Sequence, residues 1–541
     1  MEDLDMFKVQ KYSSEPQDIY LLIARDPKTL LLYLNNYHRL VLGKTRALYS
    51  IFYVGDDCRE DYIKDISQVF LTMWFNYGIL NVVASAPFSC YSESIYIYNP
   101  FQISEAEPFE YGVLKVYQLE KVVNRPYLIF NHLLHLNNYS LKTLLFNRNP
   151  TSLKVMPKSL TTREIYIKIH EISGYVGVDA AILTTMAAYL NFTIKNYDAE
   201  IDSDFGYVFK NGTVTGSLGK IVRKEADLSA NGRFVADYNT SGIEFTIPYT
   251  SEKICIVVPK SPRVPQWMST FKYFHWISWL FLFWVFLLYI LILYFANVKE
   301  GIFRAWFVIT SIFLSMPVRF PRRTHLELLL VSCMIINVII TGIFQGSLVK
   351  SFSKVTYYSD INTLEDLDDS GFPIYTSFSI FGTNESNLVK RLYSRTRMNY
   401  QNVVILDEMF HGKSIAGVER KNDAELFLKT KYIGPDGNPL LHIVKECPKS
   451  YFMAYILPVG SPLLPRINWF LRKLTESGLV DKWYQDTVDS IILDFLVENP
   501  YRKEIDRPFN LEDLQAAFGL LIFGLFIASI VFCIEIWFYL K

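Results

Sequence analysis

Few residues in this chain of 541 have the types and spacing that catalysis or metal binding requires. His132 and His135 lie three positions apart, but no acid or thiol accompanies them in a metal-binding pattern. The sequence has no Gly-x-Ser-x-Gly, His-Glu-x-x-His or phosphate-loop motif. We therefore expect no enzyme, no cofactor and no metal site, and both histidines are more simply explained as ordinary helix or strand residues.

The cysteines suggest disulfides rather than a metal. Cys333 and Cys533 fall in long apolar segments, whereas the other four fall in mixed sequence where export would allow disulfides to form: Cys58, Cys90, Cys255 and Cys447. Four cysteines allow three pairings, and the sequence does not choose among them.

Five Asn-x-Ser/Thr sequons are candidate glycosylation sites, and all lie outside the apolar segments. They are Asn138, Asn191, Asn211, Asn239 and Asn384.

Three long apolar segments predict that the chain crosses a membrane. Residues 273–296, 328–349 and 514–534 contain no Lys, Arg, Asp or Glu. Each is long enough to span a hydrocarbon core ~30 Å thick at a rise of ~1.5 Å per residue. A fourth apolar stretch, residues 305–318, is too short to span and contains Pro317, so it predicts a re-entrant loop. A span, a re-entrant loop and a span form the arrangement expected of a pore.

The short connections between these segments orient the chain. Residues 297–304 and 319–325 hold five basic residues against one acid, Glu300, which places them inside the cell and the large polar blocks outside. The net charge is zero and no basic block is present, which argues against nucleic acid as a partner. The acidic start lacks the features of a signal peptide, so we expect an incomplete start or another export signal.

Outside the membrane, strand-like and helical runs alternate. Apolar residues on one face predict a helix over residues 180–190. Further runs predict strands at 243–247, 253–259 and 372–375, and helices at 364–367 and 387–393. This alternation predicts an α/β sandwich in two half-domains, with a ligand cleft between hinged lobes.

Residues 451–484 give the chain a resemblance to a known family. Gly460-Ser-Pro, followed by Glu476-Ser-Gly-Leu and Lys482-Trp, resembles the second ligand-binding segment of ionotropic glutamate receptors. The resemblance is closest to their divergent arthropod branch, the chemosensory ionotropic receptors. Ser461 is suited to cap a helix with Pro462 at its first position, and Gly478 is suited to end one. Further motifs match in order over roughly residues 125–540: Asn137-Asn-Tyr-Ser-Leu, Gly177-Val-Asp, Gly216-Ser-Leu-Gly, Phe245-Thr-Ile-Pro-Tyr and Phe344-Gln-Gly-Ser-Leu.

The resemblance implies a bilobed, periplasmic-binding-protein-like α/β ligand domain, split by an α-helical pore of three spans and a re-entrant loop. Its implied parts are a short extracellular N-terminal region (1–124), ligand-binding segment 1 (125–268), a first span (272–296), the pore loop (302–318), a second span with the gate (326–350), ligand-binding segment 2 (355–505) and a third span (514–538). The implied function is a ligand-gated, non-selective cation channel subunit for chemosensation, in the plasma membrane of a sensory dendrite. It would bind a small molecule and assemble with co-receptor subunits of the same family as a heterotetramer.

The implied ligand residues depart from the family. Glutamate-binding members hold the ligand's carboxylate with an arginine, and the matching position here is Asn239, which cannot form a bidentate guanidinium–carboxylate pair. We therefore expect that glutamate does not gate this chain. Arg233 would match only with a six-residue insertion, and is otherwise an ordinary surface-loop residue. Thr383 and Glu419 fall near the family's ligand-binding hydroxyl and acid, although a solvated surface position is the simpler interpretation of both.

The implied pore also departs from the family. The position that sets divalent permeation falls on Leu314, followed by Ser315 and Met316, so no carboxylate or amide lies at the constriction. The loop either conducts cations past its backbone carbonyls or packs structurally while partner subunits form the filter. A non-conducting binding or trafficking subunit is therefore the competing hypothesis. The implied gate is at residues 344–346: Phe344, Gln345 and Gly346.

Overall fold

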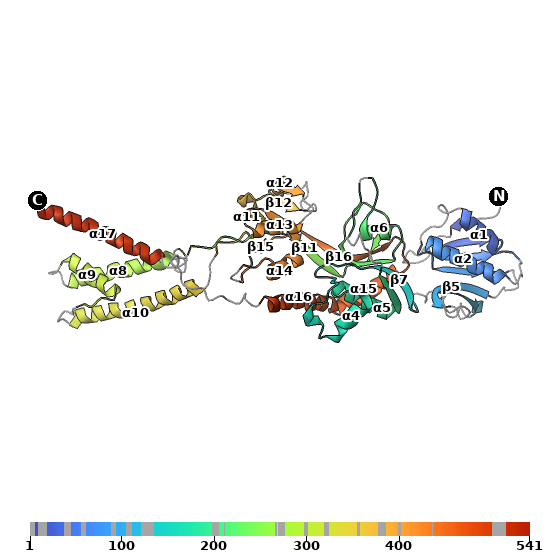
Figure 1. The fold of residues 1–541 in the computed structure, drawn as a ribbon, viewed down its shortest axis with the longest axis horizontal. Coiled ribbons are helices and arrows are strands. Elements are labelled where there is room, and N and C mark those ends of the chain that lie inside the picture. The colour runs from blue at the N-terminus through green and yellow to red at the C-terminus, as the bar shows by residue number, and fades with distance from the viewer. Residues whose placement is uncertain are drawn as a thin grey trace. The chain divides into compact units, whose positions relative to one another are not determined.

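The chain divides into two structural units, each built from two separate stretches of sequence. In the computed structural model, unit 1 comprises Met1–Val258 and Gly371–Arg502, and unit 2 comprises Pro259–Ser370 and Lys503–Lys541 (Figure 1). The structure describes residues 6–8, 19–36, 45–55, 61–87, 94–103, 111–120, 135–196, 205–209, 211–265, 268, 276–296, 301–318, 324–353, 357–376, 386–398, 402–434, 437–499 and 515–540.

The N-terminal part of unit 1 contains a six-stranded mixed sheet with two helices. The strands follow one another in chain order, β2, β3 and β4 are parallel, and β5 and β6 close the sheet as an antiparallel pair. The strands are β1 (Met6–Lys8), β2 (Ile19–Ala24), β3 (Leu48–Tyr53), β4 (Val82–Ser85), β5 (Ser94–Ile103) and β6 (Tyr111–Gln118), and the helices are α1 (Pro27–Asn36) and α2 (Tyr62–Tyr77). Parallel strands need a crossover connection, and in the sequence α1 connects β2 to β3 and α2 connects β3 to β4.

A ten-stranded sheet forms the rest of unit 1. Its order is β13-β12-β14-β11-β16-β9-β7-β8, with β10 on β16 and β15 on β11. The strands are β7 (Tyr139–Leu144), β8 (Phe192–Asn196), β9 (Leu228–Phe234), β10 (Ile243–Phe245), β11 (Thr250–Pro259), β12 (Ile374–Thr376), β13 (Thr396–Met398), β14 (Ala416–Arg420), β15 (Leu441–Ile443) and β16 (Lys449–Pro458). The central pair, β11 and β16, comes from opposite sides of the membrane segments in the sequence. The expected α/β class is therefore confirmed.

Two separate apolar cores define two lobes. Lobe 1 (β7–β10) packs around α5 and α15, and lobe 2 (β12–β15) packs around α13 and α14 (Figure 1). The helices of lobe 1 are α4 (Glu164–Ser173), α5 (Val178–Leu190), α6 (Gly216–Val222), α15 (Leu464–Glu476) and α16 (Leu479–Glu498), and those of lobe 2 are α12 (Asn387–Ser394), α13 (Asn402–Phe410) and α14 (Lys421–Thr430). β11 pairs with β14 of lobe 2 and with β16, and β16 pairs with β9 and β10 of lobe 1, so β11 and β16 together link the lobes.

The expected helix start at Ser461 and Pro462 is wrong. α15 begins three residues after Ser461, at Leu464, with Pro465 in its first turn. Gly460 and Ser461 form a turn instead, and their carbonyl groups accept hydrogen bonds from Thr45 and Arg46 at 2.7 and 2.8 Å. Gly478, with φ of 72°, ends α15 as expected, because a left-handed backbone is open to glycine.

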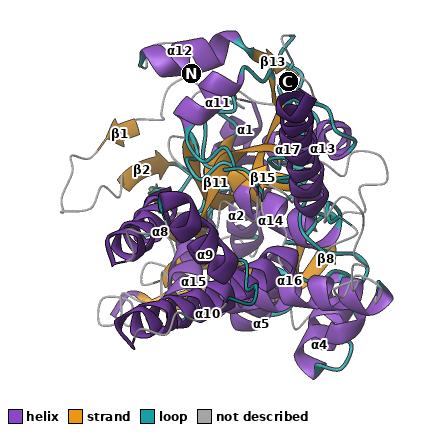
Figure 2. Ribbon diagram, turned by 90° about the vertical axis from the view of Figure 1, so that its left-hand side faces the viewer, coloured by secondary structure: helices purple, strands orange, loops and turns teal. Residues whose placement is uncertain are grey.

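Unit 2 holds the apolar helices. Among the described residues, three helices are long and apolar enough to cross a membrane: α8 (Trp276–Ala296), α10 (Thr324–Ser353) and α17 (Gln515–Leu540). The shorter α9 (Ile302–Phe313) packs against both α8 and α10 through an apolar cluster that includes Ile309 and Ile312, and the three lie together in Figure 2. α11 (Leu364–Ser370) follows α10 in the sequence.

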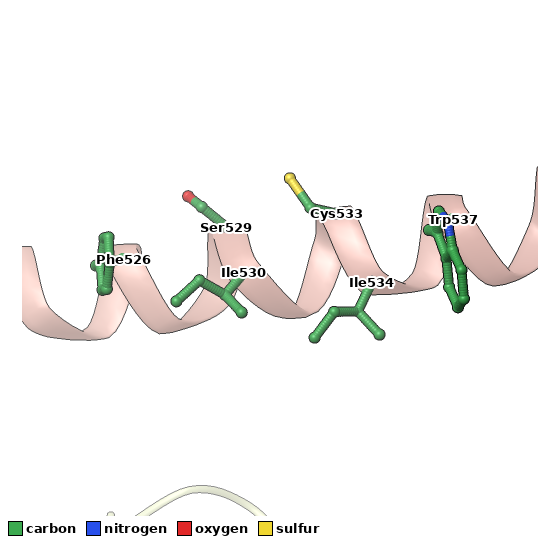
Figure 3. Close-up of a pocket in the computed structure, with 6 residues that line it drawn as sticks. All are labelled: Phe526, Ser529, Ile530, Cys533, Ile534 and Trp537. Atoms are coloured by element: carbon green, nitrogen blue, oxygen red, sulfur yellow. The ribbon is translucent and has the colours of Figure 1, made fainter.

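α17 exposes its side chains from Ala517 to Leu540. Six of them line an apolar hollow on one face: Phe526, Ser529, Ile530, Cys533, Ile534 and Trp537 (Figure 3). A helix that is apolar on all sides is one that lipid or other helices surround.

Candidate ligand-binding site

An ion pair joins the two lobes. Arg148, which follows β7 in lobe 1, donates from Nη2 to Oδ2 of Asp423 at 2.7 Å. Asp423 lies in the first turn of α14 in lobe 2, where the partial positive charge of the helix N-terminus favours a carboxylate. The two side chains are only 14% and 13% exposed, so this pair is screened far less than a surface salt bridge. The lobes are therefore held together by the chain's own charges.

Two further carboxylates lie beside this pair. Glu252 on β11 accepts hydrogen bonds from the backbone N–H and the side-chain amide of Asn422, at 3.1 and 2.9 Å. Glu419 on β14 accepts from the backbone N–H of Arg420 at 3.0 Å. Burial, and next the charge of Asp423, raises the pKa of Glu419 to about 7, and burial likewise raises the pKa of Glu252. Glu419 is not the solvated surface residue that we expected: it is half-buried on β14, an interior strand that pairs with β11 and β12.

Arg420 completes the interlobe cluster, which we define as Arg148, Glu252, Glu419, Arg420 and Asp423. Its guanidinium carbon lies 4.2 Å from the ring centre of Phe234 at the end of β9 and 5.6 Å from that of Phe205, so lobe 2 contacts aromatic rings of lobe 1. Burial, and next the charge of Arg148, lowers the pKa of the Arg420 guanidinium to about 10. The sequence analysis missed Arg420, Arg148 and Asp423, although Arg420 and Asp423 stand one and four positions after Glu419.

Arg233 is a buried strand residue and not the surface-loop residue that we expected. It lies on β9 with 1% of its surface exposed and donates to the carbonyl of Phe205 and the hydroxyl of Ser217. Its guanidinium lies 5.0 Å from the ring centre of Phe205 and 5.9 Å from that of Tyr238. The Phe205 ring is therefore in contact with two arginines, one from each lobe.

Asn239, which takes the place of the family's carboxylate clamp, is not a member of this cluster. It is an exposed turn residue with φ of 54°, and its backbone N–H donates to Asp237 at 2.8 Å. Asn138, Asn191 and Asn211 are also exposed. Asn384 and the candidate ligand residue Thr383 lie outside the described residues.

A buried carboxylate fixes the strands beneath the cluster. Asp179, at the start of α5, accepts hydrogen bonds from the hydroxyls of Tyr249 and Tyr455 at 3.1 and 3.0 Å, and from the N–H of Gly232 at 3.4 Å. These donors come from β9, β16 and the start of β11, and burial raises the pKa of Asp179. One side chain therefore ties together the strands that carry Phe234 and the interlobe link.

A disulfide joins the two segments that cross between the lobes. Cys255 on β11 is bonded to Cys447, just before β16, with their Cα atoms 4.3 Å apart. The structure therefore selects a pairing that the sequence left open, and Cys58 and Cys90 lie outside the described residues. Cys255 stands opposite Glu419 in the antiparallel register of β11 and β14, so the disulfide fixes the backbone next to the cluster.

The two segments that lead into and out of the membrane helices lie side by side in unit 2. Arg263 and Tyr357 form an antiparallel bridge, and the N–H of Tyr358 donates to the carbonyl of Pro262 at 3.2 Å. The hydroxyl of Ser261 donates to the carbonyl of Ser359 at 2.8 Å. These paired segments, residues 260–265 and 357–360, are called the linkers below.

The end of α9 is tied to α10. The side-chain amide of Asn337, which is 7% exposed, donates to the carbonyl of Ile312 at 2.9 Å and reaches the hydroxyl of Ser315 at 3.4 Å. Ser315 has φ of 55°, and its neighbours Leu314 and Met316 are 69% and 59% exposed. The three expected pore residues thus form one turn that presents two apolar side chains.

The three expected gate residues lie on α10, which runs without a break from Thr324 to Ser353. Gln345 and Gly346 are exposed, and a Cβ atom at Gly346 would have no described residue within 4 Å.

Among the described residues, no group of histidine, cysteine or acidic side chains is placed to hold a metal ion. No protein-family model matches this chain, and no curated protein matches it.

Proposed function

We propose that this chain is a subunit of a ligand-gated, non-selective cation channel that serves chemosensation. The observation that carries the proposal is the order in which the sheet strands and the apolar helices follow one another along the chain. β11 and β16 pair in one sheet, yet α8, α9 and α10 are inserted between them. A change in the distance between the lobes would therefore act on both linkers, which stand in the sequence between the lobes and helices α8 and α10.

In this proposal a small molecule binds between the lobes and stabilises the conformation in which they are closed. The linkers then pull on α10 and separate the helices at residues 344–346. The exposed turn position of Asn239 supports a ligand other than glutamate, since the family's clamp position lies outside the interlobe cluster.

A single chain supplies only part of a pore, so we propose that it assembles with co-receptor subunits of the same family as a heterotetramer. The apolar surface of α17 supports contact with lipid or with neighbouring subunits. We place the protein in the plasma membrane of a sensory dendrite with unit 1 outside the cell, where Asn138, Asn191, Asn211 and Asn239 would carry glycans.

One observation favours a second candidate, a non-conducting subunit that binds ligand or assists trafficking. The turn after α9 exposes Leu314 and Met316 and offers no charged or amide side chain to an ion. In that case partner subunits would form the whole filter.

Two-electrode recording from oocytes tests both candidates. The chain is expressed alone and with candidate co-receptors, and a panel that includes glutamate is applied. We expect a ligand-evoked cation current only with a co-receptor, and none with glutamate. Transfer of residues 302–318 into a conducting relative separates the candidates, because loss of current at normal surface expression would contradict the channel and favour the non-conducting subunit.

A further inference from the structure

Arg420 differs from the other members of the interlobe cluster because, within the described part of the chain, its guanidinium makes no hydrogen bond and no ion pair. Arg148 and Asp423 pair with each other, and Glu252 and Glu419 accept hydrogen bonds. The guanidinium lies against the rings of Phe234 and Phe205, and the charges of Asp423, Glu252 and Glu419 also act on it. A guanidinium has five N–H donors, and because this side chain is partly exposed, those donors are open to an acceptor from outside the chain.

The surroundings of Arg420 favour an anion over a cation. Arg233 lies against the same Phe205 ring, so a cationic ligand on these aromatic faces would meet two guanidinium groups. The charge of Arg148 also acts on Arg420, lowering its pKa. The three carboxylates nearby are already engaged with donors of the chain. An anion would instead supply the acceptors that Arg420 lacks.

The anion is best matched by a carboxylate. A planar carboxylate accepts two parallel hydrogen bonds from one guanidinium, and its single charge is repelled less by Glu419 and Asp423 than a phosphate dianion would be. The rings of Phe234 and Tyr451 pack with their centres 4.9 Å apart, and they extend the apolar surface beside Arg420. This surface suits a short aliphatic or aromatic tail.

We infer that Arg420, on lobe 2, binds the carboxylate of a small organic acid whose apolar tail lies against Phe234 and Phe205 of lobe 1. The carboxylate clamp would thus lie on the opposite lobe from the Asn239 position. The inference rests on the proposed function in that it takes the space between the lobes as the ligand site. A ligand held in this way would contact both lobes and favour their closure.

Ligand binding to the purified full-length chain in lipid nanodiscs tests the inference without a current. The probes are matched pairs of equal size, butyrate with butylamine and phenylacetate with phenethylamine, together with inorganic phosphate. Calorimetry measures the affinity of each. We expect at least one carboxylate to bind and its amine to be at least about tenfold weaker.

The variant Arg420→Gln removes the guanidinium, and Lys421→Gln removes one positive charge at the next position, where the side chain is 43% exposed. We expect Arg420→Gln to weaken carboxylate binding by about 30-fold or more, because two charge-assisted hydrogen bonds are lost, and Lys421→Gln to change it less than about twofold. Arg420→Lys keeps the positive charge but not the two parallel N–H donors of the guanidinium, so its affinity for the carboxylate should lie between those of the two variants. If Arg420→Gln does not fold, Arg420→Lys and Phe234→Leu provide the same comparison.

Binding of an amine in preference to its carboxylate, equal binding by Arg420→Gln and the wild type, or no binding by any carboxylate would each overturn the inference. Different outcomes would contradict the proposed function. Carboxylate binding that depends on Arg420 with no current in any subunit combination would leave the inference standing and contradict the channel. A current evoked by an amine and unchanged in Arg420→Gln would support the channel and overturn the inference.

Discussion

The ion pair between Arg148 and Asp423 predicts a measurable loss of stability in lobe 2. Asp423→Asn keeps the shape of the side chain but leaves the Arg148 guanidinium, which is 14% exposed, without its carboxylate and close to Arg420. Breaking a buried pair from one side costs roughly 3–5 kcal/mol, and the remaining exposure places this pair at the lower end, about 3 kcal/mol. Replacing both partners, as in Arg148→Gln with Asp423→Asn, should recover most of that loss, because neither charge is then left alone.

Hydrogen exchange of the full-length chain in nanodiscs measures this effect. The most protected amides of α14 report the free energy of unfolding lobe 2, which must break the pair. A loss of about 3 kcal/mol corresponds to exchange about 100-fold faster, since 1.36 kcal/mol is a factor of ten. Glu425→Gln, in the same helix, breaks an exposed pair with Lys421 and serves as the matched control, with an expected change below about 0.5 kcal/mol. Exchange in Asp423→Asn no faster than in the control, or a double variant as unstable as the single one, would refute the reasoning.

Three further predictions concern buried polar groups. The pKa of Glu419 is raised from 4.5 to about 7, so this carboxyl group binds a proton more tightly in the folded chain than in the unfolded chain. The resulting stability, up to about 3 kcal/mol, is fully present below pH 4.5 and is lost as the pH rises through 7. Glu419→Gln should flatten this pH dependence in thermal melts from about pH 5 to 8. Asp179→Ala should destabilise unit 1 by roughly 3–5 kcal/mol, because two buried tyrosine hydroxyls and the N–H of Gly232 lose their acceptor. Denaturant unfolding measures this loss, and a cost below about 1 kcal/mol would show that the network does not stabilise the fold. Asn337→Leu should lower the free energy of unfolding of the α9–α10 contact by about 1–3 kcal/mol, because the carbonyl of Ile312 loses its donor. Gln345→Leu, on the exposed part of α10, should leave it unchanged, and thermal melts of the two variants make the comparison.

Several elements follow from the sequence because their cause is local. The membrane helices could be predicted because a charge-free run of sufficient length has few other stable environments, and α5 could be predicted from the spacing of its apolar residues. Gly478 ends α15 because glycine adopts the left-handed backbone at little cost, a property of the residue itself. The exact start of α15 was not predicted, because the carbonyls of Gly460 and Ser461 are bound by residues more than 400 positions earlier in the chain.

The candidate ligand site was decided by the tertiary structure. Arg148 and Asp423 are 275 positions apart in the sequence, and Arg420 meets Phe234 only because β14 and β9 belong to one sheet around β11 and β16. The same long-range pairing brings Cys255 to Cys447 and buries Arg233, which the sequence presented as a loop residue. Local propensity and hydrophobic period act over a few residues, so the sequence by itself determined the membrane segments and the alternation of strands and helices. Which charges meet, and which remain without a partner, depends on the order of strands in the sheet, and only the folded chain sets that order.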